Sequence, residues 1–405
     1  MSTPRLSPEL PALLALVERV RPVAVAHAED SERRRTLAPE VVSALRESGL
    51  FALAVPRALG GHECDPLGQI QVFSAMAAAD GSAGWSLMIG SMMIALAGAY
   101  LPDAGAARVF STPHPIAAGL LMPSGLARRV PGGVRVRGRW AFGSGIRHAD
   151  WIVTGAVVEP TGEAPPGPPL LINLAVPAAL AVIEDTWDTA GLRGSGSEHY
   201  RLEDVFVPDE QTCAFPAAPP RRGGPLFTLP LMALLAPAHI GFALGTARRA
   251  LDEITALAPG RRKLWTGAAL DTHAGFHAEL GRAEATLGAA RAFAFEVVGA
   301  AWDRALAGEA ITIAEGAAVR LAIAHTTDAA AEVTTFAYRA GGGPALHAAS
   351  PLQRCFRDIH AATQHVAAGD DAYEVAGRVR LGQAGEGHPM LAPRRAAVGP
   401  ARAEA

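Results

Sequence analysis

Apolar residues return at helical spacing through residues 1–115 of the chain. In the segments 13–20 and 41–50, leucine and valine recur every three or four positions among polar residues. This period places the apolar side chains on one face of a helix, where they can pack against a core. Residues 1–115 are therefore predicted to form an N-terminal helical domain.

Two helix-start signals lie inside this part of the chain. Asp65 and Pro66 precede an apolar segment, and they predict a helix over residues 67–79. Ser82 stands before a second apolar segment, and its hydroxyl is expected to cap a helix that runs through Trp85.

The pattern changes to that of strands over residues 116–222. β-Branched residues alternate with other residues at 134–137 and 151–154, as in strands with one buried face. A Pro-Gly-Gly sequence at 131–133 predicts a hairpin turn, and the proline-rich segment 160–169 predicts a flexible loop. Residues 116–222 are therefore predicted to form a β domain.

The helical period returns in residues 223–384 and predicts a C-terminal helical bundle. Helices are expected at 250–257, 276–298, 314–338 and 352–366. The Pro-, Ala- and Arg-rich tail 385–405 is expected to be disordered. The order of helices, strands and helices predicts an α+β fold in which a small β-barrel or sandwich lies between two helical portions.

The longest uncharged run, residues 226–247, is long enough to cross a bilayer. Pro230, Pro237 and His239 interrupt it, and Arg248 follows it directly. These residues favour a buried core helix over a membrane span, so no membrane partner is expected.

Charge excludes a nucleic acid as the partner of this chain. The 405 residues contain 36 Lys and Arg against 39 Asp and Glu, which gives a formal net charge of -3. No basic run is long enough to neutralise a row of phosphates.

Cysteine and histidine spacing predicts no metal site. Cys64, Cys213 and Cys355 lie far apart in the sequence, without the short-spaced pairs of zinc sites or redox dithiols. His273 and His277 are four residues apart, but the pair lacks the glutamate of a zincin motif and is interpreted as part of a solvated helix face. Unpaired cysteines are typical of a reducing, cytoplasmic location.

Three polar stretches carry the candidate chemistry. In the first, Ser144 stands between two glycines at the end of a strand, where it could contact a flat ligand or only cap a turn. The second, residues 185–197, is a loop rich in hydrogen-bond donors. In the third, residues 354–365, Asp358 and His365 are seven positions apart and are expected to share one helix face.

These stretches, in this order, resemble the acyl-CoA dehydrogenase superfamily and, within it, the two-component (group D) flavin-dependent monooxygenase or hydroxylase branch. The resemblance covers residues 36–382. It implies an N-terminal helical domain, a central β-barrel and a C-terminal four-helix bundle, assembled into a homotetramer or homodimer. The flavin would lie between barrel and bundle.

The residue in the position of the catalytic base separates the branches of this superfamily. The dehydrogenases commonly carry a glutamate near the end of the bundle, where this chain reads Thr363-Gln364-His365. Other members place the glutamate on an earlier helix, so Glu253 keeps an acyl-CoA dehydrogenase with bound FAD open as an alternative.

The resemblance and the three stretches together give a set of expected site residues. Ser144 and His365 are the expected catalytic residues. The expected flavin contacts are Trp85, Trp140, Gly143, Ser144, Arg193 and Ser197. The expected substrate pocket includes Met93, Gly119 and Asp358.

The activity implied by the resemblance is hydroxylation of a small aromatic or polyketide-type molecule through a C4a-(hydro)peroxyflavin. The cofactor would be reduced FMN or FAD, with O2 as the oxidant. Because the chain carries no nicotinamide-binding fingerprint, a separate NAD(P)H:flavin reductase is expected to supply the flavin. An N- or S-oxygenase on the same scaffold, and a binding protein without catalysis, remain alternatives.

Overall fold

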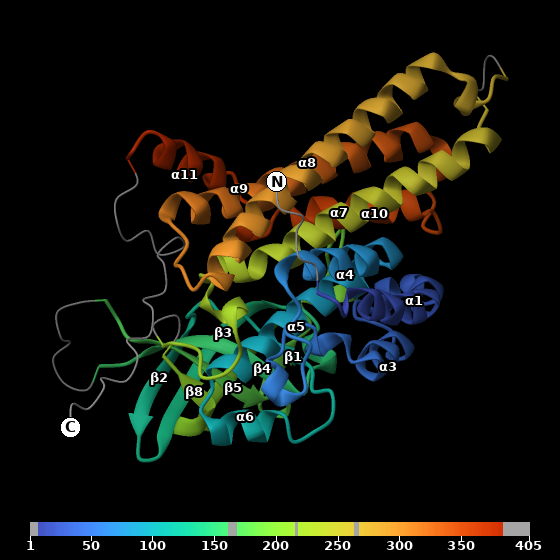
Figure 1. Cartoon of the computed structure of the whole chain (residues 1–405). Coiled ribbons are helices and arrows are strands. Elements are labelled where there is room, and N and C mark those ends of the chain that lie inside the picture. Colours follow the sequence, from blue (N-terminus) through green and yellow to red (C-terminus); the bar gives the residue numbers. More distant parts are fainter. Residues whose placement is uncertain (1–6, 161–167, 215–217, 263–266, 384–405) are drawn as a thin grey trace.

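The computed structural model describes residues 7–160, 168–214, 218–262 and 267–383, and it shows helices, then strands, then helices (Figure 1). Most of the predicted loop at 160–169 and the whole predicted tail at 385–405 lie outside the described residues. The fold class predicted from the pattern, α+β with a central β unit between helical portions, is confirmed.

The N-terminal portion consists of helices joined by short turns. Asp65 accepts hydrogen bonds from Leu67 N and Gly68 N, so the predicted helix start at Asp65 and Pro66 is confirmed. The cap predicted for the next helix is wrong by two residues, because Asp80, and not Ser82, accepts from Ala83 N. The helices are α1 (Leu10–Ala26), α2 (Ala28–Arg34), α3 (Pro39–Ser48), α4 (Pro66–Ala79), α5 (Gly81–Tyr100) and α6 (Asp103–Val109).

The central portion is one mixed sheet of eight strands. Its hydrogen-bonded order is β6-β7-β3-β2-β4-β5-β8, with β1 paired to β4, and no ladder joins β6 to β8 among the described residues. The predicted hairpin turn at 131–133 is confirmed between β2 and β3. The strands are β1 (Ala117–Ala118), β2 (Gly125–Val130), β3 (Gly133–Gly143), β4 (Trp151–Val158), β5 (Leu171–Pro177), β6 (Val182–Glu184), β7 (Glu198–Pro208) and β8 (Thr212–Cys213).

The C-terminal portion is a bundle in which α9 packs against α7, α8, α10 and α11. The helix predicted at 352–366 is shorter than expected, because α10 ends at Ala362. The helices are α7 (Leu231–Leu257), α8 (Ala274–Leu306), α9 (Ile313–Gly341), α10 (Pro351–Ala362) and α11 (Asp371–Arg380).

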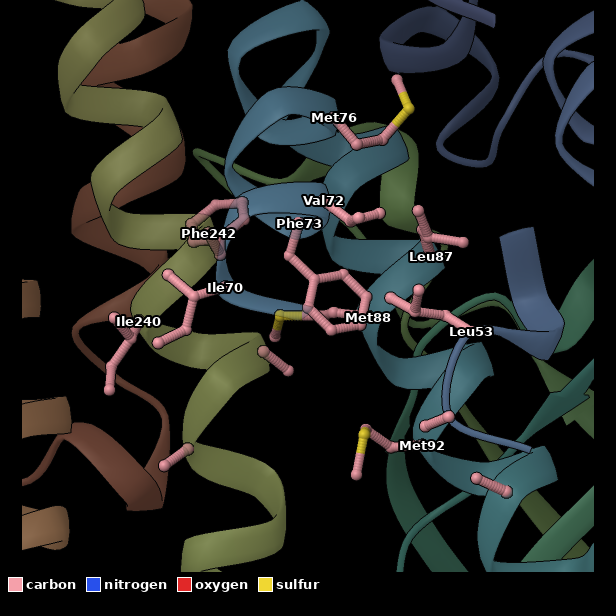
Figure 2. Close-up of a cluster of buried hydrophobic side chains, with 14 of the residues drawn as sticks. Leu53, Ile70, Val72, Phe73, Met76, Leu87, Met88, Met92, Ile240 and Phe242 are labelled. Atoms are coloured by element: carbon pink, nitrogen blue, oxygen red, sulfur yellow. The ribbon is translucent and has the colours of Figure 1, made fainter. Parts of the chain in front are cut away.

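The N-terminal helices and the bundle share one core, in which α4, α5 and α7 meet. Figure 2 shows Ile70 and Phe73 of α4, Met88 of α5, and Ile240 and Phe242 of α7 in this cluster. A Cβ at Gly245 of α7 would collide with the backbone of Ser74 in α4, so glycine permits the two helices to approach this closely. The close approach fixes α7, which carries part of the site, against the N-terminal helices.

Two helices are long and apolar enough to cross a membrane by length and composition alone. They are α5 and the segment 231–260, which includes α7. Their most apolar windows are 94% and 83% buried inside the protein. Both have the burial of core helices, as predicted for residues 226–247.

Candidate active site

Trp85 and Ser144 are brought together from the N-terminal helices and the sheet. Trp85 lies in the second turn of α5, after the cap that Asp80 provides. Ser144 follows β3 directly. The indole Nε1 of Trp85 donates a hydrogen bond of 3.0 Å to Ser144 Oγ, and both side chains are about 6% exposed. The two residues therefore form a buried joint between α5 and the sheet.

Ser144 also begins a chain of three hydroxyls. Its Oγ lies 2.7 Å from Ser197 Oγ, which lies 2.8 Å from Ser195 Oγ. Ser195 is fully buried, and its hydroxyl has no other hydrogen-bond partner among the described residues. Its proton is used only if Ser195 donates to Ser197. In the bond between Ser197 and Ser144, either hydroxyl can be the donor. When Ser197 is that donor, Ser144 accepts from both Trp85 and Ser197 and its own proton can bind a ligand.

His365 approaches the same tryptophan from the bundle. It follows the end of α10, half-buried, and its ring centroid lies 5.7 Å from that of Trp85. The backbone N–H of Ala367 donates to His365 Nδ1 at 3.2 Å, so Nδ1 is unprotonated. Burial lowers the pKa of His365 to about 4. At neutral pH the ring is therefore uncharged, with its one proton on Nε2.

A second histidine, His239, completes this cluster and was not predicted as a site residue. It lies on α7, and its ring centroid is 4.4 Å from that of His365 and 6.0 Å from that of Trp85. Burial, and then the charge that His365 would carry, hold the pKa of His239 well below its usual range. Phe242, one turn further along α7, meets Trp85 edge to face at 5.1 Å. The sequence did carry a signal, because His239 is the one ionisable residue in the run 226–247.

Trp140, predicted as a flavin contact, lies instead in the core of the sheet. It is 0% exposed, its ring stacks on Tyr200 at 5.5 Å, and its Nε1 donates to Gly155 O. The open aromatic residue of this stretch is Phe142, which is 60% exposed. The register of β3 shifts between Trp140 and Gly143, and Phe142 has a positive φ of 62°. This bulge turns Phe142 outward beside Ser144, whereas regular alternation would have put it on the face of Trp140.

Two more of the expected flavin contacts, Gly143 and Arg193, lie apart from the cluster of Trp85, Ser144, His239 and His365. Gly143 faces Tyr200 and Ile146 in the core of the sheet. The guanidinium of Arg193 donates to Asp188 and to Thr189 O within its own loop.

Met93 and Gly119, expected in the substrate pocket, both lie in packed regions. Met93 is 5% exposed and lies two turns beyond Trp85 on α5. Gly119 has a φ of 131°, and a Cβ there would collide with the carbonyl of Val153.

Asp358 does not share a helix face with His365, because α10 ends between them. Its Oδ1 accepts from Leu192 N at 2.6 Å, and its other oxygen lies against Gly81 at the start of α5. Burial, and then the charge of Asp80, raise the pKa of Asp358 to about 7. The carboxyl joins α10 to the loop that leads to Ser195 and to the N-terminus of α5, so we assign it a positioning role.

Asp358→Asn is expected to remove a pH dependence of stability. The folded pKa of Asp358 lies above its unfolded value, so its contribution to stability is complete at low pH and is lost as the pH rises through about 7. Asparagine keeps the acceptor for Leu192 N without the charge. The variant should therefore gain stability relative to the wild type between pH 5.5 and 8, by about 1 kcal/mol or more. Urea unfolding at both pH values measures this, with Asp188→Asn in an exposed loop as the control. Parallel pH profiles for wild type and variant would contradict it.

A groove of about 830 Å³ lies elsewhere, between α8, α9 and α10. Phe276, Phe336 and His360 line it, and none of the four clustered residues does. We place the candidate site at Trp85 and not in this groove. The hydrogen-bond donors, the neutral imidazoles and the aromatic side chains lie together around Trp85.

The clustered residues fit a flat heteroaromatic cofactor. Ser144 offers a hydroxyl, His365 offers Nε2–H, and Trp85 and Phe242 supply apolar surface. Donors at the edge of an aromatic wall match the ring nitrogens and carbonyls of a flavin.

Comparison with known proteins also points to a flavin-binding protein. Family models described as "Acyl-CoA dehydrogenase, N-terminal domain" and "Acyl-CoA dehydrogenase, C-terminal domain" match residues 12–101 and 238–369. The chain is 33% identical over 374 residues to the indole-3-acetate monooxygenase of Pseudomonas putida, which covers 92% of this chain and 94% of that protein.

Two further relatives carry the cofactor in their names. The chain is 31% identical over 239 residues to the FADH(2)-dependent resorcinol hydroxylase, oxygenase component, of Rhizobium sp. strain MTP-10005, covering 56% of this chain and 58% of that one. The solved structure of XiaF from Streptomyces sp., in complex with FADH2 and glycerol, superposes with a TM-score of 0.84 at 27% identity, covering 92% and 97% of the two chains.

Fold and site together define a flavoenzyme built on the acyl-CoA dehydrogenase scaffold. The chain belongs to the acyl-CoA dehydrogenase family, in its flavin-dependent monooxygenase branch. It is an enzyme that uses reduced flavin and O2 on a small molecule, and relatives that are oxygenase components imply a separate reductase.

Proposed function

We propose that this enzyme hydroxylates a small aromatic molecule as the oxygenase component of a two-component system. The carrying observation is the neutral His365, whose free Nε2–H lies in a cluster with Trp85 and Ser144. No described residue in ring or hydrogen-bond contact with His365 is a carboxylate. An aromatic substrate suits the apolar walls, and the curated relatives described above are named for aromatic compounds.

The same observation disfavours the dehydrogenase alternative. That chemistry needs a carboxylate base within reach of the flavin. Glu253 lies 14 residues after His239 on α7, which corresponds to about 21 Å of helix rise. Its carboxylate faces Arg249 at 3.6 Å.

Each residue of the cluster has a separate proposed role around the cofactor. When bound, reduced flavin supplies the electrons that allow O2 to deliver one oxygen atom to the substrate and the other to water. Ser144 would hold the cofactor through its hydroxyl, which the indole N–H of Trp85 positions. His365 keeps a proton on Nε2 to donate toward the reacting oxygen, while the apolar wall of Trp85 and Phe242 excludes water.

The proposed oligomeric state and location rest on the surface of the bundle and on the cysteines. The bundle presents an aromatic groove between α8, α9 and α10, which suits assembly into a homotetramer through this face. Light scattering on the purified protein measures that state. Cys64 and Cys355 are free and buried, which suits the reducing cytoplasm.

Anaerobic mixing with reduced FMN or reduced FAD, followed by O2, tests the proposed function. With indole-3-acetate as the probe, we expect hydroxylated product, little hydrogen peroxide, and a slower return of oxidised flavin than in buffer. Ser144→Ala should weaken reduced-flavin binding about tenfold, because a hydrogen bond in a buried site is lost. Ser86→Ala is the matched control, since it removes a buried hydroxyl that has no partner among the described residues. A protein that instead retains oxidised FAD and is bleached by an acyl-CoA would be a dehydrogenase.

A further inference from the structure

His239 is a buried polar side chain whose hydrogen-bonding capacity is unused. It is 7% exposed, and neither ring nitrogen has a hydrogen-bond partner among the described residues. A buried polar group left without a partner costs about 1–3 kcal/mol. The two rings that contact His239 lie against its faces and edges and do not bond its nitrogens. The ring keeps a small exposed area, so its nitrogens can bond to water or to a bound ligand.

The surroundings of His239 indicate which kind of ligand group its ring can bind. Among charged groups, only His365 affects the pKa of His239. No carboxylate or guanidinium therefore lies close enough to compensate a charge on a ligand bound at His239. A neutral imidazole among apolar side chains does not stabilise a charged ligand group. It does offer one bare nitrogen, in either tautomer, that accepts from a neutral O–H or N–H.

The two histidines of the cluster are not equivalent. His365 uses Nδ1 to accept from Ala367 N, which leaves it a proton donor at Nε2. His239 has no such bond and keeps a bare nitrogen. It also lies next to Phe242 on α7, a helix that close packing against α4 holds in place. The pair thus presents one fixed donor and one free acceptor side by side.

We propose that His239 is the substrate-recognition residue, which accepts a hydrogen bond from a ring O–H or N–H of the aromatic substrate. This inference rests on the proposed function and names the substrate class within it: phenols and N-unsubstituted indoles or pyrroles. The hydrogen bond orients the ring beside His365. It also increases electron density in the ring that is to be hydroxylated, and it requires no net transfer of the proton.

Binding of matched probes to the flavin-free protein tests this role. Indole and 1-methylindole differ in the N–H that His239 would bind. Calorimetry is expected to show the wild type binding indole about tenfold more tightly, the effect of one hydrogen bond to a buried acceptor. His239→Leu should abolish the preference, and His239→Gln, which keeps an acceptor, should retain part of it. Thr246→Val on the same helix, whose hydroxyl bonds within α7, is the control that should keep it.

A second measurement does not depend on the folding of a variant. The ¹⁵N resonances of the His239 ring should shift when indole is added and not when 1-methylindole is added. Equal binding of the two probes by the wild type, or an unchanged preference in His239→Leu, would overturn the inference and leave His239 as a packing or water-binding residue.

The outcomes also separate this inference from the proposed function. If the N–H preference depends on His239 but no aromatic probe is hydroxylated with reduced flavin, recognition by His239 stands and the proposed function fails. If indole and 1-methylindole are hydroxylated by wild type and His239→Leu in the same kcat/KM ratio, the function stands and the inference fails.

Discussion

His365→Ala is expected to lower the yield of hydroxylated product per flavin oxidised by at least tenfold, with hydrogen peroxide rising to match. A positioned general acid contributes about 10²–10⁴-fold to a rate, and the variant loses the Nε2–H that lies beside Trp85. Oxidation of the flavin itself should continue. Parallel assays of product and peroxide measure this coupling.

Two further variants isolate the imidazole. His365→Asn keeps an acceptor for the N–H of Ala367 and so preserves the local cap, yet it should remain uncoupled. His360→Ala removes a histidine from the exposed side of α10, where its ring contacts Phe356, and should couple normally. Normal coupling in His365→Ala would remove His365 from the mechanism.

Trp140→Ala is expected to cost about 3–5 kcal/mol of unfolding free energy, as large buried aromatic side chains do on truncation. The substitution opens a cavity next to Tyr200 and leaves the carbonyl of Gly155 without its donor. Phe142→Ala should leave stability within about 0.5 kcal/mol, because that ring is exposed. Its ring meets Trp187 and His199 edge to face and none of the four clustered residues, so reduced-flavin binding should also stay unchanged.

Urea unfolding and anaerobic flavin titration on the same two variants check both effects. If Trp140→Ala keeps its stability but loses flavin binding, the tryptophan contacts the cofactor and its role in the core of the sheet is wrong. A matched change at Phe206, another exposed aromatic residue of the sheet, should affect neither measurement.

The sequence predicted the elements well where one physical signal dominated. Periodicity located the helices, and Asp65 with Pro66 marked the start of α4, because capping is a local interaction. It failed where two local signals competed for the same position. Asp80 caps α5 although Ser82 is also a good capping residue.

The candidate site shows the same division. Ser144, Ser197, Trp85 and His365 were predicted, and the structure brings them into one cluster. The bulge that turns Phe142 outward and the end of α10 before His365 could not be read from spacing, since both break the regular period that spacing arguments assume. His239 was treated only as an interruption of an apolar run, because nothing in its neighbours along the chain reports the distant ring of His365.

The hydroxyl chain that supports Ser144 has a closed end. Ser195 is fully buried, so no solvent proton can enter the chain there, and the three hydroxyls cannot act as a conducting wire between water and the active site. They position the hydroxyl of Ser144. Protons that the reaction takes up or releases must travel by another route. The half-buried His365, flanked by the exposed Gln364 and Val366, is the member of the cluster that lies next to solvent.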